Sequence, residues 1–140
     1  MRLRSILALL VLLLACALQF WFVSAGVFIN FILATLIVFA FFFDIGELAV
    51  FVLFALFVIN WSPVISVDLF MFGIIPFAAY AFHRFFAWTL WAGIPAAIIC
   101  GFLLLYLVIA PAAFLGNLGP FLIDIVGGLI FGGAAWFILK

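Results

Sequence analysis

The sequence predicts an all-α protein: one domain formed by an integral membrane bundle of about six transmembrane helices with short loops. Two observations carry this prediction. Of the 140 residues, 75% are hydrophobic and only 6% are charged, so the chain lacks the polar residues that a soluble domain needs on its surface. The apolar residues also fall into runs of helical length, separated by charged or turn-forming residues.

The first run, residues 5–23, is long enough to cross a hydrocarbon core of about 30 Å as a helix. Two processing signals compete with this interpretation. The segment 13–16, which ends at Cys16, resembles a lipoprotein cleavage site, and the segment 23–25 resembles a signal peptidase site. The run exceeds the apolar core of a signal peptide, about 7 to 15 residues, so we expect it to stay as a span.

The second and third runs cover residues 26–43 and 47–61. Between them, the segment 44–47 supplies two acids and a glycine, a composition typical of a tight turn. The third run is short and ends at an interfacial aromatic residue, Trp61, two positions before the helix breaker Pro63. Two separate spans are the first interpretation, and a re-entrant pair is the alternative.

The last three runs cover residues 69–82, 88–110 and 120–139. Asp68 precedes the fourth run at the position of a helix cap or first-turn acid. Tryptophan marks the beginning of the fifth run and Tyr106 lies near its end, which is the aromatic pattern of the two membrane interfaces.

The four basic residues give the bundle an orientation. With six spans, all of them fall on one side of the membrane: Arg2, Arg4, Arg84 and Lys140. Short loops rich in Lys and Arg stay cytoplasmic, so both termini are predicted to be cytoplasmic in a bacterial-type inner membrane.

Asp124 is the most informative polar residue because it lies about one turn inside the sixth run, where a carboxylate facing lipid is unfavourable. Gly127, Gly128 and Gly132 share its side of the helix, and the last two form a GxxxG motif that lets another helix approach closely. The first interpretation is an acid that caps or hydrogen-bonds a neighbouring helix. A proton or ion site and a polar group for docking a partner are the alternatives.

Other polar residues are predicted near the same outer side: Gln19, Asn30, Asp68 and Asn117. Two independent acids at helix starts, stabilised by the helix dipole, are the first interpretation of Asp68 and Asp124, and a shared site for a cation or an amine is the alternative. Gln19 and Asn30 are expected to form hydrogen bonds between helices, and all four residues are candidate contacts for a partner or ligand.

The chain contains no motif that predicts catalysis. A nucleophile with a neighbouring base, a glycine-rich phosphate loop and a metal-ligand cluster are all missing from the sequence, so we expect neither an enzyme nor a cofactor. Because the formal net charge is zero and there is no basic tract, nucleic acid is not an expected partner. The lipid bilayer is the partner that the composition predicts, together with another membrane protein.

The order of the segments resembles the family of the rod shape-determining protein MreD. A basic N-terminus and first span are followed by Asn30-Phe31-Ile32-Leu33, a tight inner turn and a short third span. The later segment 67–73, in which Asp68 precedes Gly73, is similar to the family segment where an acid and then a glycine open the next helix. The resemblance implies a non-enzymatic scaffold for cell-wall elongation and cell shape, with an MreC-like partner.

The alternative is the substrate-binding membrane subunit of a vitamin-type uptake transporter, which also has six helices and cytoplasmic termini. That function requires a polar pocket near the outer face, and the candidate lining residues are Gln19, Asn30, Asn60, Asp68, Asn117 and Asp124. In an uptake subunit these residues should converge on one cavity. In a scaffold they should be distributed among separate helix contacts.

Overall fold

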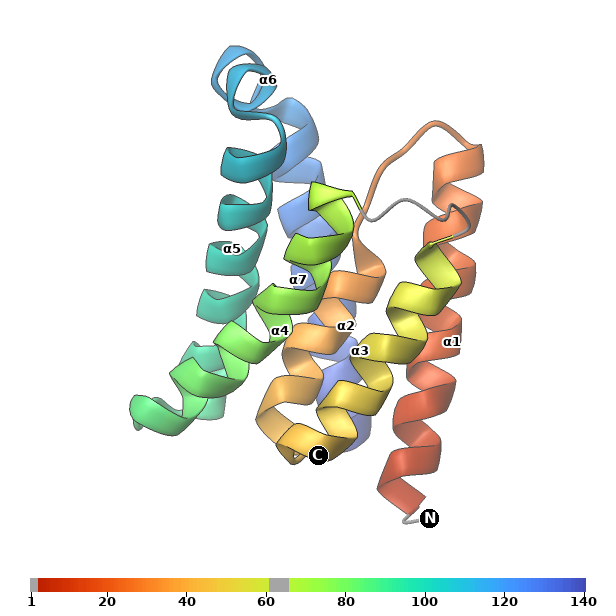
Figure 1. The fold of residues 1–140 in the computed structure, drawn as a ribbon, viewed down its shortest axis with the longest axis vertical. Coiled ribbons are helices and arrows are strands. Elements are labelled where there is room, and N and C mark those ends of the chain that lie inside the picture. Colours follow the sequence, from red (N-terminus) through yellow and green to blue (C-terminus); the bar gives the residue numbers. More distant parts are fainter. Residues whose placement is uncertain (1–2, 61–65) are drawn as a thin grey trace.

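The computed structural model describes residues 3–60 and 66–140, and within these ranges the chain has seven helices and no strand (Figure 1). The helices are α1 (Leu3–Ser24), α2 (Phe31–Phe42), α3 (Ile45–Ile59), α4 (Val67–Phe85), α5 (Leu90–Ile109), α6 (Pro111–Gly116) and α7 (Gly119–Leu139). The predicted all-α class is therefore confirmed for the described residues. Arg2, the predicted end of the third run at Trp61, and Pro63 lie outside them.

Helix α2 is the core of the bundle. It packs against α1, α3, α4, α5 and α7, and the side chains of residues 31–41 are all buried. In Figure 1 it lies in the middle, with the other long helices around it. Thr35 is the polar residue of this helix, and its hydroxyl donates to the carbonyl of Phe31 at 2.8 Å, so the group is satisfied inside the helix.

The second helix begins at Phe31 rather than at Gly26, where the second run starts, because Gly26 terminates α1. Gly26 has a φ of +80°, in the left-handed region that favours glycine. Its N–H donates to the carbonyl of Val23 at 3.0 Å, and the N–H of Val27 donates to the carbonyl of Phe22 at 2.9 Å. These two bonds form a Schellman motif, and the chain then runs as a non-helical segment to the start of α2.

Three helices are long and apolar enough to cross a membrane: α1, α5 and α7. Helices α2 and α3 are also apolar but have 12 and 15 residues. At the helical rise they measure about 18 and 22 Å, less than a hydrocarbon core of about 30 Å. Helix α4 has 19 residues and carries charged residues in its first and last turns.

A short helix, α6, lies within residues 111–119, a segment that the run boundaries assign to a loop. Pro111 lies in the first turn of α6. A backbone N–H in that turn would have no acceptor within the helix, so proline, which has no N–H, loses no hydrogen bond there. After α6 ends at Gly116, the side-chain oxygen of Asn117 accepts the N–H of Gly119 at 3.0 Å, and α7 begins. The connection between α5 and α7 is thus a compact helical turn.

Three glycines of α7, at positions 127, 128 and 132, lie where this helix contacts its neighbours. A Cβ atom at Gly128 would lie 2.8 Å from the ring of Phe102 on α5, and one at Gly132 would lie 2.6 Å from Cδ1 of Ile98. At Gly127 the nearest atom would be 2.7 Å away, on the segment before α2. Carbon atoms normally pack at about 3.5–4.0 Å, so a Cβ atom at any of these positions would force the neighbouring side chain to move.

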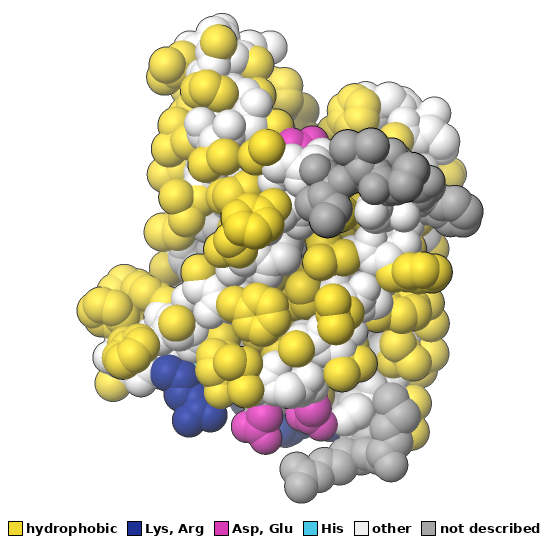
Figure 2. All heavy atoms as spheres, in the orientation of Figure 1, with side chains coloured by type: hydrophobic (Ala, Val, Ile, Leu, Met, Phe, Trp, Pro, Cys, Tyr) yellow, Lys and Arg dark blue, Asp and Glu magenta, His cyan; other side chains and the backbone are white. Residues whose placement is uncertain are grey.

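The side of the bundle is apolar and its charged side chains gather at the ends. Figure 2 shows hydrophobic side chains over α3 and α4, with Lys, Arg, Asp and Glu side chains together at the lower end. The beginning of α1 and the end of α7 lie at the same lower end in Figure 1. An apolar side surface of this extent fits a hydrocarbon environment, since in water it would favour association.

Candidate functional site

Asp124 is the one acid that the described part of the chain buries completely, at 0% exposure. Its Oδ1 accepts the backbone N–H of Asn30 at 2.6 Å. Its Oδ2 accepts the side-chain amide of Asn30 and the hydroxyl of Tyr106, the latter at 3.0 Å. Both oxygens act as acceptors, as those of an ionised carboxylate do. These bonds replace the water that the carboxylate gives up on burial.

Gln19 of α1 reaches the same end of α2. Its Oε1 accepts the backbone N–H of Ile32 at 3.0 Å. The first N–H groups of any helix have no acceptor within that helix, and Asn30, although it is the N-cap residue, makes no side-chain cap of its own. The caps of α2 therefore come from two neighbouring helices, α7 and α1.

We call Gln19, Asn30, Tyr106 and Asp124 the α2-cap cluster. The N-terminus of a helix carries a partial positive charge, so the carboxylate of Asp124 lies where the helix dipole stabilises it. The low dielectric of the interior strengthens this attraction. The cluster also joins α1, α5 and α7 to the beginning of the central helix, which fixes the relative position of four helices by directional bonds.

The remaining candidate residues do not join this cluster. Asp68 is exposed in the first turn of α4, where the hydroxyl of Ser66 is the cap and accepts the N–H of Leu69 at 3.3 Å. Asn117 is exposed and bonds within its own turn, and Asn60 is the C-cap residue of α3. The cation site considered for Asp68 and Asp124 does not form, because one is exposed at a helix start and the other is enclosed by the α2-cap cluster.

Tyr106 is the member of the cluster that sequence reasoning missed. Its position near the outer end of the fifth run was interpreted as that of an interfacial aromatic residue. The sequence did hold a signal: Tyr106 and Asp124 are both predicted near the outer ends of consecutive antiparallel spans, which brings a hydroxyl donor to the level of a carboxylate acceptor.

A second group of charges lies at the other end of the bundle. Arg4, Ser5, Asp44 and Glu47 line a cavity of about 360 Å³ between the beginning of α1 and the turn from α2 to α3. The hydroxyl of Ser5 donates to Glu47 at 3.4 Å, and a nitrogen of Arg84 lies 4.0 Å from Oδ1 of Asp44. This end of the bundle carries both signs of charge.

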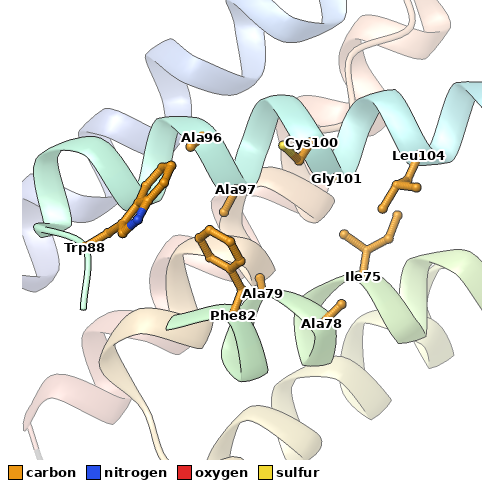
Figure 3. A pocket seen from close by; sticks show the side chains of 10 residues that line it. All are labelled: Ile75, Ala78, Ala79, Phe82, Trp88, Ala96, Ala97, Cys100, Gly101 and Leu104. Atoms are coloured by element: carbon orange, nitrogen blue, oxygen red, sulfur yellow. The ribbon is translucent and has the colours of Figure 1, made fainter. Parts of the chain in front are cut away.

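An apolar cavity of about 310 Å³ lies between α4 and α5 (Figure 3). Phe82 and Trp88 stand near one end of it, and the small residues Ala79, Ala97 and Gly101 form much of its floor. Small side chains leave room for a bulky apolar group from outside the chain. Because its lining is apolar, this cavity is suited to a hydrocarbon chain or to a side chain of another helix.

The described residues hold no group of three or more His, Cys, Asp or Glu side chains that could bind a metal ion. Comparisons of the chain with models of protein families, with curated proteins and with solved structures find no match. The case for a function therefore rests on the geometry of the α2-cap cluster and of the surface cavities.

Proposed function

We propose that the chain is a non-enzymatic scaffold with six spans in a bacterial-type inner membrane, and that it works by packing against another membrane protein. One observation carries this proposal. Asn30 and Asp124 bond with each other, and Gln19 accepts a backbone N–H of α2, so these polar groups are used within the bundle. The polar groups then hold the fold together, and the side of the bundle is left apolar for contacts in the plane of the membrane.

The uptake-subunit alternative receives less support from the same contacts. It requires Gln19, Asn30, Asn60, Asp68, Asn117 and Asp124 to line one cavity. Three of these six residues lie at the beginning of α2, where Asn30 bonds with Asp124 and Gln19 bonds with the backbone N–H of Ile32. Asp68 and Asn117 are exposed elsewhere, and Asn60 is the C-cap residue of α3. A polar ligand would have to displace the caps of the central helix, and that favours the scaffold.

The six-span topology with cytoplasmic termini is part of the proposal. The two ends of the described chain and the last turn of α4, which contains Arg84, lie toward one end of the bundle (Figure 1). The positive-inside rule assigns this end to the cytoplasm. In a variant without native cysteines, Asn117→Cys should react with an impermeant maleimide from outside, and Arg84→Cys should react only from inside. The opposite pattern would overturn the orientation.

The resemblance to the MreD family implies that the scaffold acts in cell-wall elongation and cell shape, with an MreC-like partner. The α4–α5 cavity offers a way to test it, because Cys100 is an exposed residue in its wall and Cys16 is buried in the core. A photoactivated benzophenone coupled to Cys100 in native membranes should form a covalent product with a cell-wall elongation protein. Moving the thiol to α7 in the double variant Cys100→Ser, Ile130→Cys is the matched control, since Ile130 is also exposed.

The outcomes separate the two hypotheses. A product that mass spectrometry identifies as an MreC-like protein, and that is formed from Cys100 and not from position 130, supports the scaffold. Purification of the chain with an ATPase partner and a stoichiometric small molecule would refute it in favour of the uptake subunit.

A further inference from the structure

A groove runs between α3 and α4 on the side of the bundle. Its volume is about 430 Å³, and residues from both helices line it: Ala49, Leu53, Leu56, Phe70, Gly73 and Phe77. The lining is entirely apolar. The groove is open at Gly73, because a Cβ atom there would meet nothing closer than Cδ1 of Leu56 at 3.5 Å. Figure 2 shows this face, with hydrophobic side chains over both helices.

Two opposite charges stand at the inner end of the same pair of helices. Arg84 belongs to the last turn of α4 and Asp44 is the N-cap residue of α3, and their closest atoms are 4.0 Å apart. The two side chains are 63% and 86% exposed, so each keeps free hydrogen-bonding capacity. Phe77 and Arg84 lie about two helical turns apart on one face of α4, and the groove therefore leads toward the charged pair.

The aromatic ring of Tyr80 contacts the side chain of Arg84 near the end of α4. The guanidinium of Arg84 lies over the ring of Tyr80, with its carbon 5.3 Å from the ring centroid. Cation–π contacts of this kind are favourable, and tyrosine is a residue of the membrane interface. The arrangement is thus an apolar groove in the hydrocarbon region that ends on a cation and an anion at the depth of the lipid headgroups.

We propose that the α3–α4 groove binds a membrane phospholipid with a phosphoethanolamine headgroup. One acyl chain lies in the groove, the guanidinium of Arg84 donates to the phosphate, and the ammonium group of the lipid donates to the carboxylate of Asp44. This inference goes beyond the scaffold function and requires only that the bundle lies in a membrane.

The charges select this headgroup among common phospholipids. Phosphoglycerol has a phosphate for Arg84 but no cation for Asp44, so its negative charge would lie beside a carboxylate. Phosphocholine has both charges, but its nitrogen carries no N–H to donate to Asp44. Phosphoethanolamine satisfies both residues, because a guanidinium–phosphate bond and an ammonium–carboxylate bond are both charge-assisted.

The test uses the whole chain in nanodiscs that contain equal amounts of phosphatidylethanolamine, phosphatidylglycerol and phosphatidylcholine with identical acyl chains. Native mass spectrometry after release counts the lipids that stay bound. We expect phosphatidylethanolamine to be retained about threefold over each of the others, because a contact between charges that stay largely exposed contributes less than a buried one. This comparison needs no variant, so it holds even if a substitution impairs folding.

Two variants then assign the site. Arg84→Gln removes the phosphate contact of a guanidinium that is 63% exposed and should lower the retention of phosphatidylethanolamine about threefold. Gly73→Leu fills the groove and should have a similar effect. The matched controls are Lys140→Gln, a basic residue at the same end on α7, and Ala134→Leu, an exposed residue of α7. Both controls should retain the lipid as the unmodified protein does.

Equal retention of the three lipids by the unmodified protein would overturn the proposal. It would also be overturned if phosphatidylethanolamine were preferred but neither Arg84→Gln nor Gly73→Leu, each with unchanged helicity by circular dichroism, reduced the preference. A dimer that Gly73→Leu dissociates, without any lipid preference, would assign the groove to a second copy of the chain instead.

Discussion

Replacing Asp124 with alanine should destabilise the bundle more than any other single change to a polar side chain in the described residues. The substitution leaves three donors without an acceptor: the backbone N–H and the side-chain amide of Asn30, and the hydroxyl of Tyr106. A hydrogen bond between membrane helices contributes about 0.6 to 2 kcal/mol. Three of them, together with the lost helix-dipole attraction, give a loss of about 3 kcal/mol in the free energy of unfolding.

The assay is equilibrium unfolding of the purified protein in mixed micelles with increasing sodium dodecyl sulfate, followed by helicity. Two further variants give a graded series. Tyr106→Phe removes one bond and should cost about 1 kcal/mol. Asp124→Asn keeps the shape of the side chain but turns an amide group toward its donors, so it should cost about 2 kcal/mol. Asp68→Ala is the control, because that acid is exposed and we expect no measurable change.

The order of the three losses is the decisive result. If Asp124→Ala destabilises the protein no more than Tyr106→Phe, the carboxylate does not hold the beginning of α2, and the structural account of the cluster is wrong. If Asp68→Ala has an effect as large as Asp124→Ala, the two acids depend on each other in a way that their separate positions do not explain.

Three further predictions follow from the same packing. Gln19→Leu removes the second cap of α2 and should lower the free energy of unfolding by about 1 kcal/mol in the same assay. Gly132→Val places side-chain atoms where Ile98 already packs and should lower the free energy of unfolding by about 1–3 kcal/mol. Gly133→Val, on the open side of α7, is the control and should lower it less. Similar losses for both variants would contradict the packing of α7 on α5. In the folded protein a lipid-soluble maleimide should modify Cys100 and spare the buried Cys16, and mass spectrometry of the two peptides reads the result.

Hydropathy predicted the six longer helices of the described chain, but it predicted neither α6 nor which helix is inside. In a soluble protein a buried face is distinguished by its apolar residues, but here the lipid-facing side is apolar too. The run 26–43 therefore looks like any other run, although its helix α2 is the buried core and measures about 18 Å, less than the thickness of the hydrocarbon core. The signal for burial was a structural one, the five helices that surround it.

Local backbone chemistry could have improved two helix boundaries. Gly26 comes two residues after the end of α1 at Ser24, and a glycine in this position is typical of a helix terminus, so the next helix must begin later. Pro111 likewise suits the first turn of a helix within the predicted outer loop. The identity of the partners of Asp124 could not be predicted in the same way, because Asn30 lies 94 residues away in the sequence and only the packing of α7 on α2 brings them together.

The few polar residues inside this apolar chain follow from the position of α2. Because α2 begins at Phe31, a buried residue that follows a non-helical segment, its first N–H groups need acceptors within the protein. Neighbouring helices must supply acceptors, and Gln19 and Asp124 do so. Since Gln19 and Asp124 are used for this task, the outer surface is left for recognition. The apolar cavities and the charged pair at Arg84 and Asp44 are therefore the places where lipid or protein partners should be sought.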